Sequence, residues 1–148
     1  MTNESETCTI LKNSLLLMNE LCFKIPDPSN SFSSTIQRPF DMIASYKGNP
    51  VYIEVKYMKG LHSFNLQEIR DHQIENLINY KNKINNAECW IVLGINVKRG
   101  DNRIYIFKDI FEIEKRRLNK DNYKVKELHQ LPYYPIKKNL CQLSFYVN

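Results

Sequence analysis

The chain has 148 residues, 43% hydrophobic and 25% charged, which is the size and composition of one ordinary globular domain. No run approaches the roughly 18 consecutive apolar residues of a membrane span. The polar, acidic start, Met1–Glu6, is not expected to act as a signal peptide. Lys and Arg number 21 against 16 Asp and Glu, and the resulting charge of +5 favours a polyanionic partner without requiring one.

The cysteines lie far apart in the chain and form no C-x-x-C pair, so neither a zinc site nor a disulfide framework is expected. We expect a cytoplasmic protein without membrane contact, whose thiols are mostly buried and reduced. The four cysteines are Cys8, Cys22, Cys89 and Cys141.

The first expected element is a helix from Thr9 to about Lys24, with Thr9 as its N-cap. Pro26 and Pro28 end this helix, and Ser29–Thr35 is expected to be a loop. The helix is predicted by one stripe of residues with helical spacing: Ile10, Leu11, Ser14, Leu15, Met18, Leu21 and Cys22.

The rest of the chain alternates strands and helices, which predicts an α/β (α+β) fold with one central mixed sheet flanked by helices. We expect a single domain with its core at about 9–118 and a C-terminal extension at 119–148. The composition of Tyr123–Asn148 permits short strands and turns but specifies none. The expected strands are Phe40–Tyr46, Val51–Tyr57, Cys89–Val97 and Ile104–Phe107, and the expected helices are Leu66–Lys83, with Asn65 and Glu68 in capping-box form, and Lys108–Leu118.

Two carboxylates and a lysine share one face of the expected hairpin. Side chains alternate along a strand, so Glu54 and Lys56 point the same way. If Lys47–Pro50 forms the turn, Asp41 lies opposite Lys56 and diagonal to Glu54, within the ~7–8 Å of diagonal neighbours. A three-residue turn would instead send Asp41 to the other face.

Two carboxylates so placed suit Mg²⁺, and a neighbouring lysine can position a metal-bound water or neutralise charge in phosphodiester hydrolysis. The same pattern also fits a solvated Glu–Lys ion pair and an Asp that caps a strand. Gln73 interrupts the apolar stripe of its helix, and a buried amide there needs partners. Hydrogen bonds to nearby backbone groups would satisfy the Gln73 amide as well as hydrogen bonds to active-site residues would.

The segment around these residues resembles the PD-(D/E)xK nucleases. Pro39 precedes Asp41, and Glu54-Val55-Lys56-Tyr57-Met58-Lys59 is followed by Ser63-Phe64-x-Leu66 and by His72-Gln73. This order is similar to that of the RecU-type Holliday-junction resolvases and covers about Arg38–Phe107.

The resemblance implies a restriction-endonuclease-like core and a homodimer that uses Mg²⁺, with Mn²⁺ as a substitute, to nick branched DNA. Asp41 and Glu54 would be metal ligands, Lys56 the catalytic lysine, and Lys59 and Gln73 supporting active-site residues. The superfamily often adds a Glu from the first helix as a further metal ligand, and Glu20 is the natural candidate. The alternative is that Glu20 is an ordinary solvent-facing side chain.

The chain departs from the resolvases in three places, one of which is Met58 in place of their usual Thr. Only Pro26–Gln37 is available for their stalk, and the part after Leu118 matches poorly. A sequence-specific restriction endonuclease and an inert DNA-binding module of the same fold therefore remain alternatives. Phosphate contacts, or plain solvated charges, are expected at Arg38, Lys47, Lys59, Lys98 and Arg99.

Overall fold

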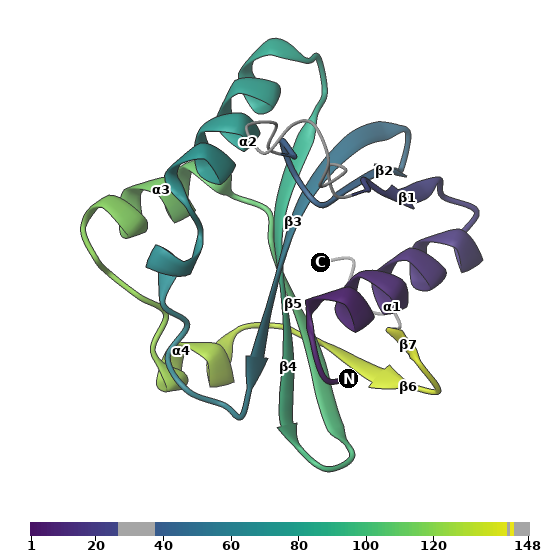
Figure 1. The fold of residues 1–148 in the computed structure, drawn as a ribbon, viewed down its shortest axis with the longest axis vertical. Coiled ribbons are helices and arrows are strands. Elements are labelled where there is room, and N and C mark those ends of the chain that lie inside the picture. Colours follow the sequence, from purple (N-terminus) through teal and green to yellow (C-terminus); the bar gives the residue numbers. More distant parts are fainter. Residues whose placement is uncertain (27–37, 142, 144–148) are drawn as a thin grey trace, which may run out of the picture.

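The structure, a computed structural model, describes residues 1–26, 38–141 and 143 (Figure 1). Its sheet has seven strands in the order β1-β2-β3-β4-β5-β6-β7; β3 and β4 are parallel, and every other neighbouring pair is antiparallel. The mixed sheet with flanking helices that the sequence predicts is therefore confirmed. The elements are α1 (Glu4–Leu17), β1 (Cys22–Lys24), β2 (Met42–Tyr46), β3 (Asn49–Lys59), the 3-10 helix η1 (Leu66–Glu68), α2 (Asp71–Lys83), β4 (Glu88–Lys98), β5 (Asp101–Phe107), α3 (Ile110–Leu118), α4 (Val125–Gln130), β6 (Tyr134–Lys137) and β7 (Leu140–Cys141).

Helix α1 begins five residues earlier than expected and ends seven residues earlier. Its N-cap is Asn3, whose Oδ1 accepts a hydrogen bond from Glu6 N at 2.8 Å. The helix ends before Asn19, which adopts a left-handed φ of 59°. The expected boundaries Thr9–Lys24 are wrong, but much of the expected stripe is buried as predicted: Ile10, Leu11, Ser14 and Leu15.

The β2–β3 hairpin turns through two residues, Lys47 and Gly48, and Tyr46 pairs with Asn49. Both turn residues have positive φ, 50° and 83°, which a tight hairpin turn requires. The expected four-residue turn is wrong, and the pairing is shifted by two positions. Because side chains alternate with a period of two, this even shift leaves Asp41 on the expected face.

Strand β3 is much longer than β2, its neighbour on one side. Strand β2 pairs with Asn49–Ile53, whereas β4 runs alongside Val51–Lys59. From Glu54 onward, the β2-side edge of β3 therefore has no neighbouring strand within the described residues. The backbone N–H of Asp41 donates to Ile53 O at 3.0 Å, just where the pairing stops. This free edge is where polar side chains can collect.

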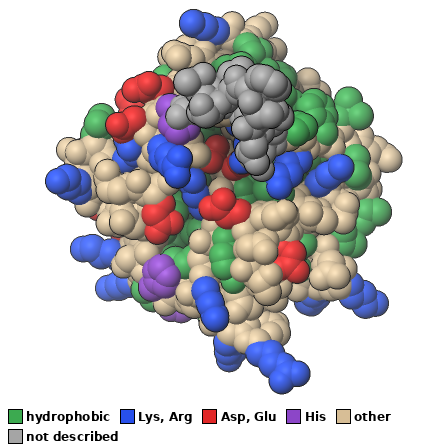
Figure 2. Space-filling view, in the orientation of Figure 1, with side chains coloured by type: hydrophobic (Ala, Val, Ile, Leu, Met, Phe, Trp, Pro, Cys, Tyr) green, Lys and Arg blue, Asp and Glu red, His purple; other side chains and the backbone are tan. Residues whose placement is uncertain are grey.

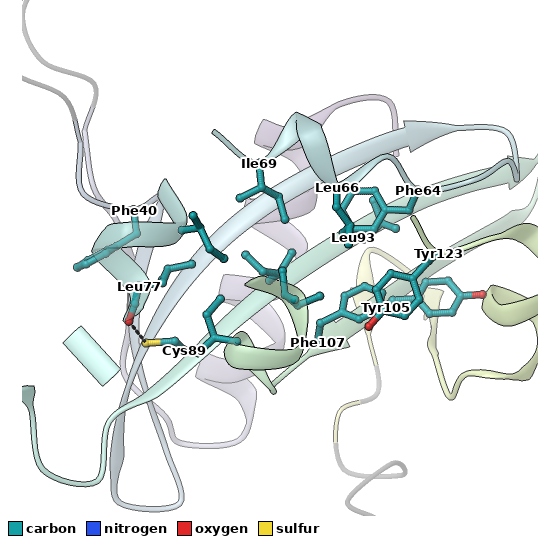
Figure 3. Packing of buried hydrophobic residues seen from close by; sticks show 14 of the residues in the cluster. Phe40, Phe64, Leu66, Ile69, Leu77, Cys89, Leu93, Tyr105, Phe107 and Tyr123 are labelled. Atoms are coloured by element: carbon teal, nitrogen blue, oxygen red, sulfur yellow. Dashed lines mark hydrogen bonds between the residues drawn. The ribbon is translucent and has the colours of Figure 1, made fainter. Parts of the chain in front are cut away.

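Helices cover both faces of the sheet (Figure 1). On one face, Leu11 and Leu15 of α1 belong to the same buried cluster as Trp90. Helices α2 and α3 pack on the other face, where a large aromatic and aliphatic cluster gathers around Phe64 and Leu66 (Figure 3). The two helical layers approach the free edge of β3 from opposite sides.

The expected helix Leu66–Lys83 is divided into η1 and α2. The Asn65 side chain caps η1 by accepting from Gln67 N at 3.0 Å, and α2 starts only at Asp71. The sequence had specified no elements in the C-terminal stretch, where the structure has α4, β6 and β7.

All four cysteines are buried and unpaired. No helix in the described part of the chain is long and apolar enough to cross a membrane. The expected loop at 29–35 and most of the segment 26–37 lie outside the described residues.

Candidate active site at the free edge of strand β3

Asp41 and Glu54 form a buried carboxylate pair just before β2 begins. Asp41 Oδ2 accepts a hydrogen bond from Val55 N at 2.8 Å, which fixes the carboxylate against the free edge of β3. Arg38 Nη2 lies 3.0 Å from Asp41 Oδ1. Asp41 is only 8% exposed and Glu54 only 2% exposed. Buried acids of this kind need a partner that offsets their loss of hydration.

Glu54 carries the clearest electrostatic signature in the site. The pKa of its carboxyl is raised to about 8, first by burial and second by the neighbouring Asp41 carboxylate, while Lys56 acts in the opposite direction. Two acids in contact resist being ionised together unless a proton or a cation lies between them. The pair is therefore poised to take up a positive charge.

Lys56 and Gln73 complete the constellation. Lys56 Nζ lies 3.4 Å from Glu54 Oε1 and 3.2 Å from Gln73 Oε1. The amide nitrogen of Gln73 donates to Glu54 Oε1 at 2.6 Å, while its oxygen also accepts from Arg70 N at 2.9 Å. Gln73 thus bonds to the lysine and the carboxylate at once, and both of its amide atoms are used.

The start of α2, which carries Gln73, is anchored by buried contacts. Phe64 and Leu66 are buried in the cluster shown in Figure 3. Leu66 N donates to Asn122 Oδ1 at 2.9 Å, and Arg117 Nε donates to Ile69 O at 2.7 Å. The Ser63-Phe64-x-Leu66 segment therefore fixes the position of the loop before α2, so that Gln73 points toward β3.

These side chains line an open hollow of about 420 Å³. Acidic and basic side chains gather near the middle of the face drawn in Figure 2. The residues that line the hollow are Glu4, Arg38, Asp41, Glu54, Lys56, Glu68, Arg70 and Gln73.

The acid that α1 contributes is Glu4, and the structure does not bring Glu20 to the hollow. Glu20 follows α1 and binds the β2–β3 turn instead, accepting from Ser45 Oγ at 2.7 Å and from Lys47 N at 3.1 Å. Glu4 was missed because the helix was expected to begin at Thr9. The Asn3 cap, with Glu6 three residues later, was the signal in the sequence.

Of the basic residues expected to contact phosphate, one lies at the hollow and the others lie elsewhere. Arg38 lines the hollow. Lys47 lies at the hairpin turn, and the other three lie at the far ends of β3 and β4: Lys59, Lys98 and Arg99. Arg70, which the sequence reasoning missed, is exposed and lines the hollow just before α2.

The donor chemistry of the hollow fits Mg²⁺, which takes one or two protein carboxylates and completes its shell with water and phosphate oxygens. Among the described residues, no three His, Cys, Asp or Glu side chains stand together closely enough to hold an ion by themselves. The raised pKa of Glu54 beside Asp41 is the observation that favours a cation between these two carboxylates.

Comparison with known proteins gives little further guidance. No family model matches the chain, and no curated protein matches it. One similar solved structure is Hjc, a Holliday junction resolvase from the archaeal hyperthermophile Archaeoglobus fulgidus. The match covers 79% of this chain and 92% of that chain, with 14% identity and a TM-score of 0.42. At this identity and TM-score the match assigns no function to the chain.

The raised pKa of Glu54 predicts a pH-dependent effect of Glu54→Gln on stability. Between pH 4.5 and about 8 the native state holds a proton that the unfolded state has lost, so wild-type stability falls as pH rises through this window. The variant lacks this loss, and its melting temperature at pH 8 should exceed that of the wild type by at least roughly 3 °C. Thermal melts at pH 5 should show a much smaller difference. An equal difference in melting temperature at both pH values would contradict a raised pKa for Glu54.

The position of Glu20 predicts a structural rather than a catalytic role. Glu20→Ala removes two hydrogen bonds to the hairpin turn and should lower the free energy of unfolding by about 1–2 kcal/mol in urea titrations. Its effect on any catalytic activity of the hollow should stay within about threefold. Glu114→Ala, on α3, is the matched control and should change stability by less than about 0.5 kcal/mol.

Proposed function

We propose that the chain is a metal-dependent endonuclease that hydrolyses phosphodiester bonds in DNA at this hollow. One observation carries the proposal: a buried Asp41–Glu54 pair lies at a free strand edge beside Lys56, which Gln73 orients. A solvated Glu–Lys ion pair would not require this burial or an amide side chain that bonds to both partners. Buried titratable groups with perturbed pKa values cluster at functional sites.

The charges of the hollow argue against an inert DNA-binding module. Four carboxylates and three cationic side chains line it, although the whole chain carries a charge of +5. A surface that only binds phosphate has no use for carboxylates at its centre, since they repel the backbone of DNA. The acids become favourable once a divalent cation links them to a phosphate.

Mg²⁺ is the proposed metal, with Mn²⁺ as a substitute. Asp41 and Glu54 would hold it, and Glu4 would approach from α1. The carbonyl of Val55 is a further candidate, because it lies on the same side of β3 as the Val55 N–H that Asp41 binds. When bound, such an ion polarises the phosphoryl group and lowers the pKa of a coordinated water.

Lys56 is the proposed catalytic lysine. Its ammonium is held within reach of the hollow by Glu54 and Gln73, and it is only 8% exposed. In this position it can neutralise charge that develops on the phosphoryl oxygens and orient the attacking water. Gln73 supports this role by fixing the side chains of both Glu54 and Lys56. Arg38 and Arg70 would bind flanking phosphates, because both line the hollow.

We infer further that the substrate is branched DNA and that the enzyme is a homodimer acting in recombination, repair or phage DNA processing. The support is the resemblance of the segment from Arg38 to Phe107 to RecU-type resolvases, together with the packing of Phe64 and Leu66 that aims Gln73 at the site. A restriction endonuclease would use the same core, and the cleavage experiment below distinguishes it from a junction resolvase.

The proposal predicts that the protein nicks a labelled four-way junction only when Mg²⁺ or Mn²⁺ is present, and cuts linear duplex of the same sequence much more slowly. Asp41→Asn should lower the rate by at least roughly 100-fold. Asp121→Asn, which changes an exposed acid outside the hollow, is the control and should retain activity.

Discrete bands from long linear duplex would instead indicate a restriction endonuclease. Binding of the junction without any cleavage in either metal would overturn the enzyme proposal in favour of an inert module.

A further inference from the structure

Strand β4 contains a glycine that no turn requires. The chain has four glycines, and Gly48, Gly60 and Gly100 all have positive φ. Gly94 does not, and it lies inside β4 with regular partners, Tyr57 on β3 and Ile104 on β5. An alanine would favour the strand conformation by roughly 0.5–1 kcal/mol. The reason for glycine at this position must therefore be space rather than backbone geometry.

The space is filled by the first turns of α1. A Cβ added at Gly94 would lie 2.5 Å from Thr7 Oγ1, 2.7 Å from Thr7 Cγ2 and 3.0 Å from Met1 Cε. The first two separations are shorter than real Cβ contacts show. Glycine thus permits α1 to lie directly against β4.

Thr7 has no room to turn away from an added methyl group. Its side chain is fully buried, and Thr7 Oγ1 donates to Asn3 O at 2.9 Å. Both γ atoms lie close to the added Cβ, and a β-branched side chain has few alternative rotamers. An alanine at position 94 would therefore displace the start of the helix rather than one side chain.

Glu4 lies on the part of α1 that would move. It precedes Thr7 by three residues, less than one helical turn, and its side chain lines the hollow with Asp41, Glu54 and Lys56. A displacement of about 1 Å at a catalytic site can cost on the order of 100-fold in rate. The contact between Thr7 and Gly94 is therefore connected to the hollow through a rigid helical turn.

We propose that Gly94 is a positioning residue: by letting Thr7 pack against β4, it sets the reach of the Glu4 carboxylate into the hollow and thereby the affinity of the site for a divalent cation. This inference rests on the proposed function, because it assigns Glu4 to the same metal site. It makes the geometry of the site depend on a contact on the face of the sheet opposite to Gln73.

The test measures Mn²⁺ affinity by calorimetry and by the Mn²⁺-dependent rise in melting temperature, with junction cleavage as a separate readout. Gly94→Ala should weaken Mn²⁺ binding about tenfold and lower cleavage by about 10–100-fold. Adding Thr7→Ala to Gly94→Ala removes the clashing atoms and should restore affinity to within about threefold. Combining Gly94→Ala with Glu4→Gln should weaken binding no more than Glu4→Gln alone, since both act through one carboxylate.

Val92→Ala is the matched control for general loss of stability. Val92 is fully buried on the same face of β4, so its truncation leaves a void without pushing α1. This variant should lower the melting temperature and keep the Mn²⁺ affinity of the wild type. Wild-type affinity in Gly94→Ala, or equal losses in Val92→Ala, would overturn the inference.

The readouts separate this inference from the proposed function. If the wild type binds Mn²⁺ in a Gly94-dependent manner but cuts no DNA, the inference stands and the nuclease proposal fails. If the wild type cuts DNA and Gly94→Ala matches it in affinity and rate, the inference alone fails. A wild-type protein that binds no Mn²⁺ overturns both.

Discussion

The unequal length of two paired strands is the constraint from which the candidate site follows. Strand β2 leaves β3 at Ile53, so the backbone of Val55 is left to bond with the side chain of Asp41 rather than with another strand. This holds a carboxylate beside Glu54, which is almost wholly buried. Two adjacent acids in low dielectric are unfavourable alone, and the rest of the site can be understood as compensation for that cost.

The residues that surround the pair come from both faces of the sheet. Helix α2 supplies Gln73, which bonds to Glu54 and Lys56, and its position depends on the packed segment around Phe64. Helix α1 supplies Glu4, and its approach depends on the close contact of Thr7 with Gly94. The strand edge thus carries Asp41, Glu54 and Lys56, while the two helical layers add Gln73 and Glu4 around them. A substitution in either layer can change the site without touching a reacting group.

Much of this arrangement could be predicted from the sequence because it depends on periodicity. Alternation along β3 placed Glu54 and Lys56 together whatever the exact turn, and the polar interruption at Gln73 marked the helix face that meets them. The assignment of Glu20 failed because apolar spacing continued past Asn19, where the left-handed backbone ends α1. The true start at Asn3 depends on a single side-chain cap, a signal much weaker than a hydrophobic stripe. The closeness of Thr7 to Gly94 joins residues far apart in the chain, so no local pattern could reveal it.

The most direct test of this account is the location of a bound ion. A crystal grown with Mn²⁺ and measured near the manganese absorption edge would show where the metal lies. The account predicts an anomalous peak between the carboxylates of Asp41 and Glu54, on the free edge of β3 and on the side from which Glu4 approaches. A peak elsewhere on the molecule, or an empty hollow with Lys56 still paired to Glu54 at saturating Mn²⁺, would contradict it.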